Sequence, residues 1–171
     1  MKRILSLSCI AATLVSAPSL AQDSSWYGDI GYQHHSADED GIDADLGTVT
    51  AHAGYKFTRN LSVEGELGFG IVDEEIDGAD LNINYLVGAY GRVEAPLSEK
   101  LSVFARAGIV QLELDVDAAG TSASESETGA GYGVGGEYRF DGVNGIRADY
   151  TRYDIDELDV DAFYIGYSRK F

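Results

Sequence analysis

The chain has 171 residues, with 29 acidic and 12 basic side chains, 21 glycines and a formal net charge of −17. This length makes one domain and leaves no room for a second catalytic module beside it. The acidic balance excludes nucleic acid as a partner, because binding DNA or RNA needs Lys and Arg clustered on one face. The glycines and 11 tyrosines favour strands with close backbone contacts.

The N-terminal segment predicts a secretory signal peptide. A basic start precedes an apolar run over residues 4–15, and small residues follow at Ser19 and Ala21. The run is shorter than the ~20 residues that a membrane-spanning helix needs. We expect cleavage after Ala21, which divides the chain into a signal peptide (1–21) and one mature domain (22–171). The single cysteine lies in the removed segment, so we expect no disulfide or cysteine-based metal site in the mature domain.

Apolar and polar residues alternate at period two along the mature domain, and no window keeps a helical apolar stripe for three turns. The alternation predicts eight strands, at residues 26–36, 48–57, 61–71, 81–95, 101–112, 129–140, 145–154 and 160–171. Tight connections are expected at residues 58–60, 96–100 and 141–144, and mostly longer ones at 37–47, 72–80, 113–128 and 155–159. An up-and-down meander of this kind closes into a barrel, which removes the exposed sheet edges.

The two faces of the expected strands differ in polarity. The apolar face includes Ile30, Tyr32, Val49, Leu67, Phe69, Ile83, Val87, Val134 and Ile165. The opposite face carries six acids and six bases, namely Asp29, Lys56, Glu64, Glu66, Arg92, Glu94, Arg106, Glu137, Arg139, Arg147, Asp149 and Lys170. Balanced charges can pair inside a narrow barrel, whereas an apolar outer band with aromatic residues near the strand ends suits a membrane.

The sequence therefore predicts an all-β fold, an eight-stranded antiparallel up-and-down transmembrane β-barrel. A secreted soluble barrel with a ligand cavity is the alternative. Inside the transmembrane barrel, we expect a charge network formed by Lys56, Glu64, Glu66, Arg92, Arg106, Glu137, Arg139, Arg147 and Asp149.

Aromatic motifs mark the first strand, the first turn and the C-terminus. They are Trp26-Tyr27-Gly28-Asp29-Ile30-Gly31-Tyr32, Tyr55-Lys56-Phe57 before the turn, and Tyr164-Ile165-Gly166-Tyr167-Ser168-Arg169-Lys170-Phe171. Together they resemble the small eight-stranded outer-membrane barrels typified by the transmembrane domain of outer membrane protein A. The resemblance implies export through the periplasm, insertion among outer-membrane lipid and lipopolysaccharide, and delivery by the outer-membrane assembly machinery. The implied assembly signal is Phe163, Ile165, Tyr167 and Phe171. The chain stops at Phe171, so we do not expect the peptidoglycan-binding domain of some relatives.

Acidic residues concentrate in the four longer connections, which we expect on the extracellular side because short turns face the periplasm. Counted with its strand edges, each has five acids and no Lys or Arg: Asp38, Glu39, Asp40, Asp43 and Asp45; Asp73, Glu74, Glu75, Asp77 and Asp80; Glu113, Asp115, Asp117, Glu125 and Glu127; Asp154, Asp156, Glu157, Asp159 and Asp161. One interpretation is a solvated, repulsive surface. The other is capture of divalent cations, which bind carboxylates. Asp73, Glu75 and Asp77 resemble the opening of a calcium loop, but Asn84 replaces its final bidentate Glu.

The sequence contains no convincing catalytic constellation, and no cofactor is expected. His34 and Ser36 share a strand face, but alternate residues lie ~6–7 Å apart along a strand, and no G-x-S-x-G motif occurs. Eight strands leave an interior filled mostly by side chains. We therefore expect a non-enzymatic outer-membrane protein that contributes to envelope integrity and surface interaction through its acidic loops. A narrow small-solute or ion channel is the first alternative, and a lipid-modifying enzyme is the second.

Overall fold

The computed structural model describes residues 25–39, 42–72, 74–76, 79–118, 121–155 and 158–171, so the expected signal peptide lies outside the described residues. Its regular structure is all β. The strands are β1 (Ser25–Glu39), β2 (Ile42–Lys56), β3 (Leu61–Val72), β4 (Glu74–Ile76), β5 (Ala79–Pro96), β6 (Leu101–Ala118), β7 (Thr121–Arg139), β8 (Asn144–Ile155) and β9 (Leu158–Lys170). Among these residues, no helix is long and apolar enough to cross a membrane.

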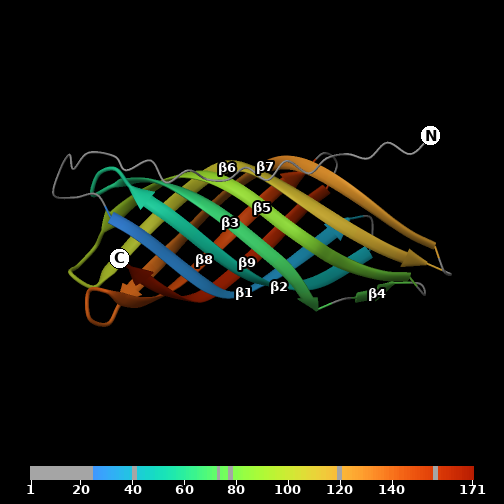
Figure 1. Cartoon of the computed structure of the whole chain (residues 1–171), viewed down its shortest axis with the longest axis horizontal. Coiled ribbons are helices and arrows are strands. Elements are labelled where there is room, and N and C mark those ends of the chain that lie inside the picture. Colours follow the sequence, from blue (N-terminus) through green and yellow to red (C-terminus); the bar gives the residue numbers. More distant parts are fainter. Residues whose placement is uncertain (1–24, 40–41, 73, 77–78, 119–120, 156–157) are drawn as a thin grey trace.

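The strands form one closed antiparallel sheet with tilted strands (Figure 1). Apart from β3 and β4, each strand pairs with its neighbours in sequence, β1 also pairs with β9, and a direct pairing of β3 with β5 completes the ring. The short β4 pairs with β5 beyond the end of β3, so β3 and β4 occupy one position in the wall. The predicted eight-stranded up-and-down barrel is confirmed.

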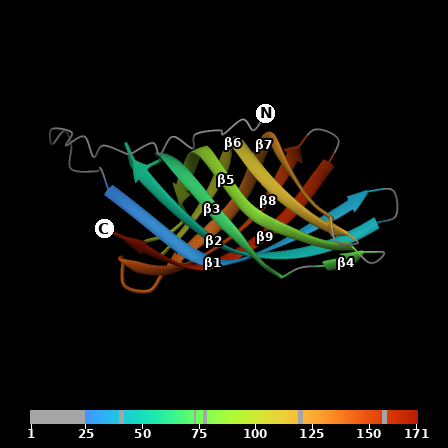
Figure 2. The ribbon, with the colours of Figure 1, turned by 45° about the vertical axis from the view of Figure 1, so that its right-hand side comes forward.

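The strands are longer than the sequence pattern suggested, and the prediction of long loops at residues 37–47 and 113–128 is wrong. The β6–β7 ladder continues to the pair Ala118 and Thr121, and the β1–β2 ladder continues to Glu39 and Ile42. Both hairpins extend at the end of the barrel opposite the C-terminus (Figure 2). The hairpins extend because backbone pairing does not need an apolar outer face. Alternation at period two persists from Gln111 to Asp117, although acidic residues occur in this segment.

Three tight turns connect strands at the end where the C-terminus lies, and they share one capping arrangement. Oxygens of the Thr58, Ser98 and Asp141 side chains each accept hydrogen bonds from backbone N–H groups two and three residues further along. This local bonding satisfies turn donors that no ladder reaches. These turns lie at the left-hand end of the barrel in Figure 1. Because short turns face the periplasm in such barrels, this end is the periplasmic end.

The outer surface of the wall is apolar. Ile109, Val134 and Phe163 are 66%, 60% and 53% exposed, as expected for side chains that lie against lipid rather than in a core. At the periplasmic end, aromatic rings pack on one another, with centroids of Trp26 and Tyr55 5.1 Å apart. Such a belt marks the level of the lipid headgroups.

One assignment to the outer face is wrong. Ile83 is only 2% exposed and points into the barrel. The pairing of β5 with β6 shifts between Ile83 and Tyr85, so the intervening Asn84 forms a β-bulge. A bulge inserts one residue and reverses the alternation beyond it, which places Ile83 inside although Tyr85 keeps the expected phase.

Inward-facing glycines make room for large interior side chains. A Cβ at Gly54 would overlap the ring of Tyr27, and one at Gly166 would overlap the Tyr164 hydroxyl. Tyr90 is accommodated in the same way by Gly88 and Gly131, where an added Cβ would come within 2.6 and 2.9 Å of its ring. The high glycine content therefore serves the packing of the interior.

Candidate functional site: the charged barrel interior

Glu64 on β3 is the centre of the charged interior. Arg147 on β8 donates two hydrogen bonds to its carboxylate, at 2.7 and 3.0 Å, in the bidentate geometry that suits a guanidinium. Arg92 and Arg106 approach the same carboxylate at 3.2 and 3.3 Å, and the Tyr27 hydroxyl donates to it at 2.9 Å. One buried acid thus joins three arginines from three other strands.

The Nε and Nη1 groups of Arg147 also donate to other carboxylates. Its Nε donates to Asp149 at 2.7 Å, and its Nη1 donates to Asp29 at 3.0 Å. Arg147 is fully buried. A buried charge is tolerated only when it is paired and hydrogen-bonded, so these acids stabilise Arg147 in the barrel.

His52 on β2 links Asp29 to a second acid, Glu66. Its Nδ1 lies 2.6 Å from Asp29 Oδ1, and its Nε2 lies 2.8 Å from Glu66 Oε2. Because ionised carboxylates only accept hydrogen bonds, the doubly protonated imidazolium satisfies both contacts at once. Glu66 also accepts from Arg106 at 2.6 Å and from the Tyr153 hydroxyl at 2.9 Å.

A third group of charges lies toward the periplasmic end. Glu94 accepts from Lys56 at 2.8 Å and from Arg92 at 2.9 Å. Glu137 forms an ion pair with Arg139 at 2.7 Å and accepts from the Ser168 hydroxyl at 2.6 Å. Arg92 therefore connects this group to Glu64, and the charges form one continuous network along the interior.

Aromatic rings lie between the guanidinium groups. The Cζ atoms of Arg92 and Arg147 lie 3.8 and 4.7 Å from the centroid of the Phe104 ring, and Arg106 lies 4.5 Å from that of Tyr90. Such cation–π contacts attract the guanidinium groups to the ring faces and add to their stabilisation inside the barrel.

The interior changes character farther from the periplasmic turns. There, side chains from β2, β5, β6, β8 and β9 meet in a buried cluster of Leu46, Ile83, Leu86, Tyr90, Val110, Leu112, Tyr153, Ile155, Val160 and Ala162. Leu86 and Val110 are each 1% exposed. The described interior thus has a charged region at its centre and periplasmic end, and an apolar cluster toward the extracellular end.

The structure brings together the residues expected in the charge network. Lys56, Glu64, Glu66, Arg92, Arg106, Glu137, Arg139, Arg147 and Asp149 are all buried, and each forms an ion pair with an interior charge. The prediction from sequence did not include the aromatic members of the network, Tyr27, Tyr90, Phe104, Tyr153 and Tyr164. Their signal was available, because all five alternate in phase with the interior charges of their strands.

The other predicted residues lie elsewhere. Phe163, Ile165, Tyr167 and Phe171 are exposed at or next to the outer face of β9. His34 and Ser36 pair through their backbones with Phe163 and Asp161, at outward positions of β1. Asp73 and Asp77 lie outside the described residues, and only the backbone of Glu75 is described. Within the described part of the chain, no cluster of His, Cys, Asp and Glu is arranged to hold a metal ion.

A closed antiparallel barrel with an apolar outer band and a charged interior defines the class of transmembrane β-barrels. Residues 7–171 match the family model of the outer membrane protein beta-barrel domain, and the chain belongs to that family. It is an integral outer-membrane protein of the porin-like class. A comparison with curated proteins gives no match.

Solved structures show the same fold. The attachment invasion locus protein Ail of Yersinia pestis, in complex with the heparin analogue sucrose octasulfate, is 20% identical with a TM-score of 0.70, covering 87% of this chain and 99% of Ail. Neisserial surface protein A is 16% identical with a TM-score of 0.74, covering 88% and 100%. The N-terminal barrel of OprF from Pseudomonas aeruginosa is 16% identical with a TM-score of 0.64, covering 88% and 98%.

Proposed function

We propose that this protein is a non-enzymatic outer-membrane barrel that contributes to envelope integrity and interacts with the cell's surroundings through acidic extracellular loops. One observation carries the proposal: the described interior is occupied by its own paired charges and apolar side chains. An interior filled in this way supports a structural role and leaves the outer wall and the loops as the interacting surfaces.

Removal of the protein from the cell tests the structural role. A strain lacking the protein should admit more of an apolar fluorescent probe across its outer membrane, and the intact chain should restore the barrier. A matched chain with Asn or Gln at the acidic positions of segments 37–47 and 154–161 should restore it equally, since the charged interior and the apolar outer band are unchanged. Unaltered probe entry in the deletion strain would contradict the proposed contribution to integrity.

Because of their negative charge, the loops are expected to bind a different partner from that of Ail. Ail is seen with a sulfated heparin analogue, whereas the four loop segments of this chain carry acids and no Lys or Arg. We propose that they attract divalent cations, which bridge them to anionic lipopolysaccharide, with Asp73, Glu75 and Asp77 among the ligands. Calorimetry with millimolar Ca²⁺ or Mg²⁺ should give weak heats that a variant with Asn or Gln at the acidic positions of all four segments lacks, and sucrose octasulfate should give none. If neither cation gives a measurable heat, divalent cations are excluded as the partner of the acidic segments.

The enzyme alternative rests on His34 and Ser36. Both residues occupy outward positions on β1 at the extracellular side, where polar side chains suit a membrane–water boundary. We expect a His34→Ala/Ser36→Ala double variant to leave the lipid composition of the outer membrane unchanged. A changed acyl-chain profile in that variant would favour a lipid-modifying enzyme.

The terminal aromatics are proposed as the signal for the outer-membrane assembly machinery. Phe171 is 77% exposed, and its backbone N–H donates to the carbonyl of Trp26 at 2.9 Å. Phe171→Ser should therefore reduce the amount of folded barrel in the membrane more strongly than Phe140→Ser, which alters a similarly placed aromatic outside the signal. Equal amounts of the two folded variants would exclude a special role for the terminal residue.

A further inference from the structure

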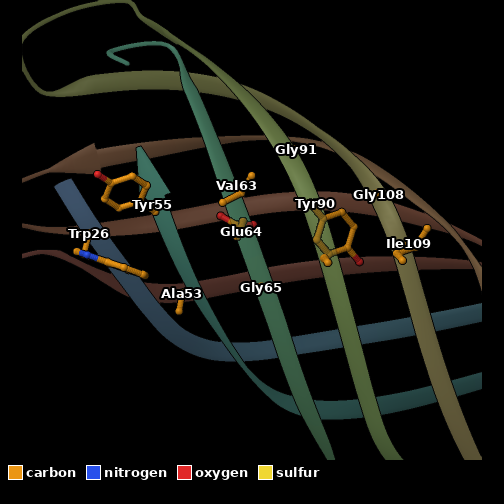
Figure 3. Close-up of a pocket in the computed structure, with 11 residues that line it drawn as sticks. Trp26, Ala53, Tyr55, Val63, Glu64, Gly65, Tyr90, Gly91, Gly108 and Ile109 are labelled. Atoms are coloured by element: carbon orange, nitrogen blue, oxygen red, sulfur yellow. The ribbon is translucent and has the colours of Figure 1, made fainter. Parts of the chain in front are cut away.

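The outer wall carries a groove where small residues from neighbouring strands come into register. Gly28, Ala53, Gly65 and Ala89 are consecutive cross-strand partners on β1, β2, β3 and β5. A hollow of about 570 Å³ lies over these strands and β6, within the ~300–1,000 Å³ of small-molecule sites. Trp26 and Tyr55 lie at one end and Ile109 at the other (Figure 3).

The groove runs from the periplasmic membrane surface toward the membrane centre. Its lining residue Trp26 lies at the beginning of β1, at the periplasmic end, whereas Ala89 lies in the middle of β5. The ring of Phe171 lies against the neighbouring Gly28. The next partner beyond Gly28 is Arg169 on β9. A cation therefore lies beside the end of the groove that reaches the inner-leaflet headgroups.

Arg169 is unusual on this surface. In the periplasmic half of the described wall, it is the one charged side chain at an outward position of a strand. Its Cζ lies 5.8 Å from the centroid of the Phe171 ring, and no carboxylate of the described residues forms an ion pair with it. By contrast, the buried arginines are paired with acids. A guanidinium at headgroup level is suited to bind phosphate.

We propose that the groove and Arg169 bind one anionic phospholipid of the inner leaflet, with its phosphate on the guanidinium beside the Phe171 ring and one acyl chain over Ala53, Gly65 and Ala89. The small residues admit the chain close to the backbone, and Trp26 and Tyr55 flank it near the headgroup. The site depends on the membrane location and is independent of the proposed role of the acidic loops.

Native mass spectrometry tests the site on full-length protein extracted in mild detergent and exposed to phosphatidylglycerol or phosphatidylcholine. The wild type should retain phosphatidylglycerol preferentially. Arg169→Gln should lower that preference by about fivefold, the effect expected when one basic contact with anionic lipid is lost. Gly65→Leu should reduce retention of both lipids, because an added Cβ there meets only backbone oxygens 3.9 and 4.0 Å away and the side chain fills the groove.

Two matched variants separate the site from general effects. Lys100→Gln removes a periplasmic cation from the turn before β6, and Gly136→Leu enlarges an outward glycine on β7, distant in register from Arg169. Both should retain phosphatidylglycerol like the wild type. The heat-dependent gel mobility of each variant confirms that it is folded. The proposal is overturned if folded Arg169→Gln keeps the wild-type preference, if Gly65→Leu retains lipid normally, or if the groove is occupied by a second copy, seen as a lipid-free dimer.

Discussion

Two regions of the barrel interior differ in how they are filled: one mainly by paired charges, the other mainly by apolar side chains. Near the centre and the periplasmic end, Glu64 and Glu66 connect arginines and His52 from across the barrel. Toward the extracellular end, Leu86 and Val110 pack in an apolar cluster. The charged region depends on each partner being present, because an unmatched buried charge is costly, whereas apolar packing loses stability in proportion to the atoms removed. The two regions should therefore respond differently to mutation.

The largest expected effect follows from removing the acid at the centre of the charged region. Glu64→Ala leaves Arg147 without its bidentate partner and should lower the free energy of unfolding by about 3–5 kcal/mol. Urea titration of the barrel in lipid vesicles measures this, with the single tryptophan, Trp26, as fluorescence reporter. Glu94→Gln is the control, since Glu94 is 8% exposed at the edge of the network and its loss should cost less. Equal effects of the two variants would contradict the central place of Glu64.

The apolar cluster is tested by Leu86→Ala. This change removes a side chain that is 1% exposed and should cost about 2–5 kcal/mol through lost burial and a residual cavity. Val87→Ala is the matched variant on the same strand, with Val87 40% exposed on the outer face. Lipid tails fill the space that the side chain leaves, so this variant should lose only the transfer of the removed atoms from water into lipid, about 1 kcal/mol, without the cost of a cavity. A larger loss for Val87→Ala would reverse the assignment of the two faces.

Glycine substitutions test how closely the interior aromatic rings pack against the backbone of neighbouring strands. Gly54→Val forces a side chain into the ring of Tyr27 and should lower the free energy of unfolding by about 1–3 kcal/mol, as overpacking does. Gly65→Val points outward, where an added Cβ meets only backbone oxygens at 3.9 and 4.0 Å, and should change stability little. The same urea titrations compare the pair. A stable Gly54→Val barrel would show that Tyr27 moves freely.

The smallest expected effect is a pH-dependent one in the turn between β7 and β8. Backbone N–H groups of Asn144 and Val143 donate to Asp141, at 2.7 and 3.0 Å, and hold the pKa of its carboxyl below the ordinary 3.8. A lowered pKa in the folded state means that the ionised carboxylate stabilises the turn at neutral pH and that this contribution fades as the pH falls below 3.8.

Asp141→Ala should therefore unfold at a slightly lower urea concentration than the wild type at pH 7 and pH 5, and the difference should shrink in more acidic solution. Ser98→Ala, which removes the equivalent cap in the turn between β5 and β6, is a control without a titrating group. Its deficit should stay constant with pH. A deficit of Asp141→Ala that also stays constant would mean that the carboxylate charge is not what stabilises the turn.

The strand number, the closed topology and the inward or outward direction of most side chains could be predicted from period-two alternation. The direction of Ile83 could not, because the bulge at Asn84 has no distinctive residue that announces it. The alternation along each strand predicts which charged side chains lie in the interior, but it does not predict which acid pairs with which base. Glu64 and Arg147 are far apart in sequence, and their contact depends on how strand tilt and stagger bring β3 opposite β8.

Planar-bilayer recording tests most directly whether the barrel interior is a filled plug or a conduit for ions. The wild-type barrel should give no conductance steps, because the charged network and the apolar cluster both occupy the path. Arg106→Ala, which removes one member of the network, should be equally silent while the apolar cluster stays intact. Reproducible steps in the wild type, altered in size by Arg106→Ala, would contradict the account and establish a narrow channel gated by the charge network.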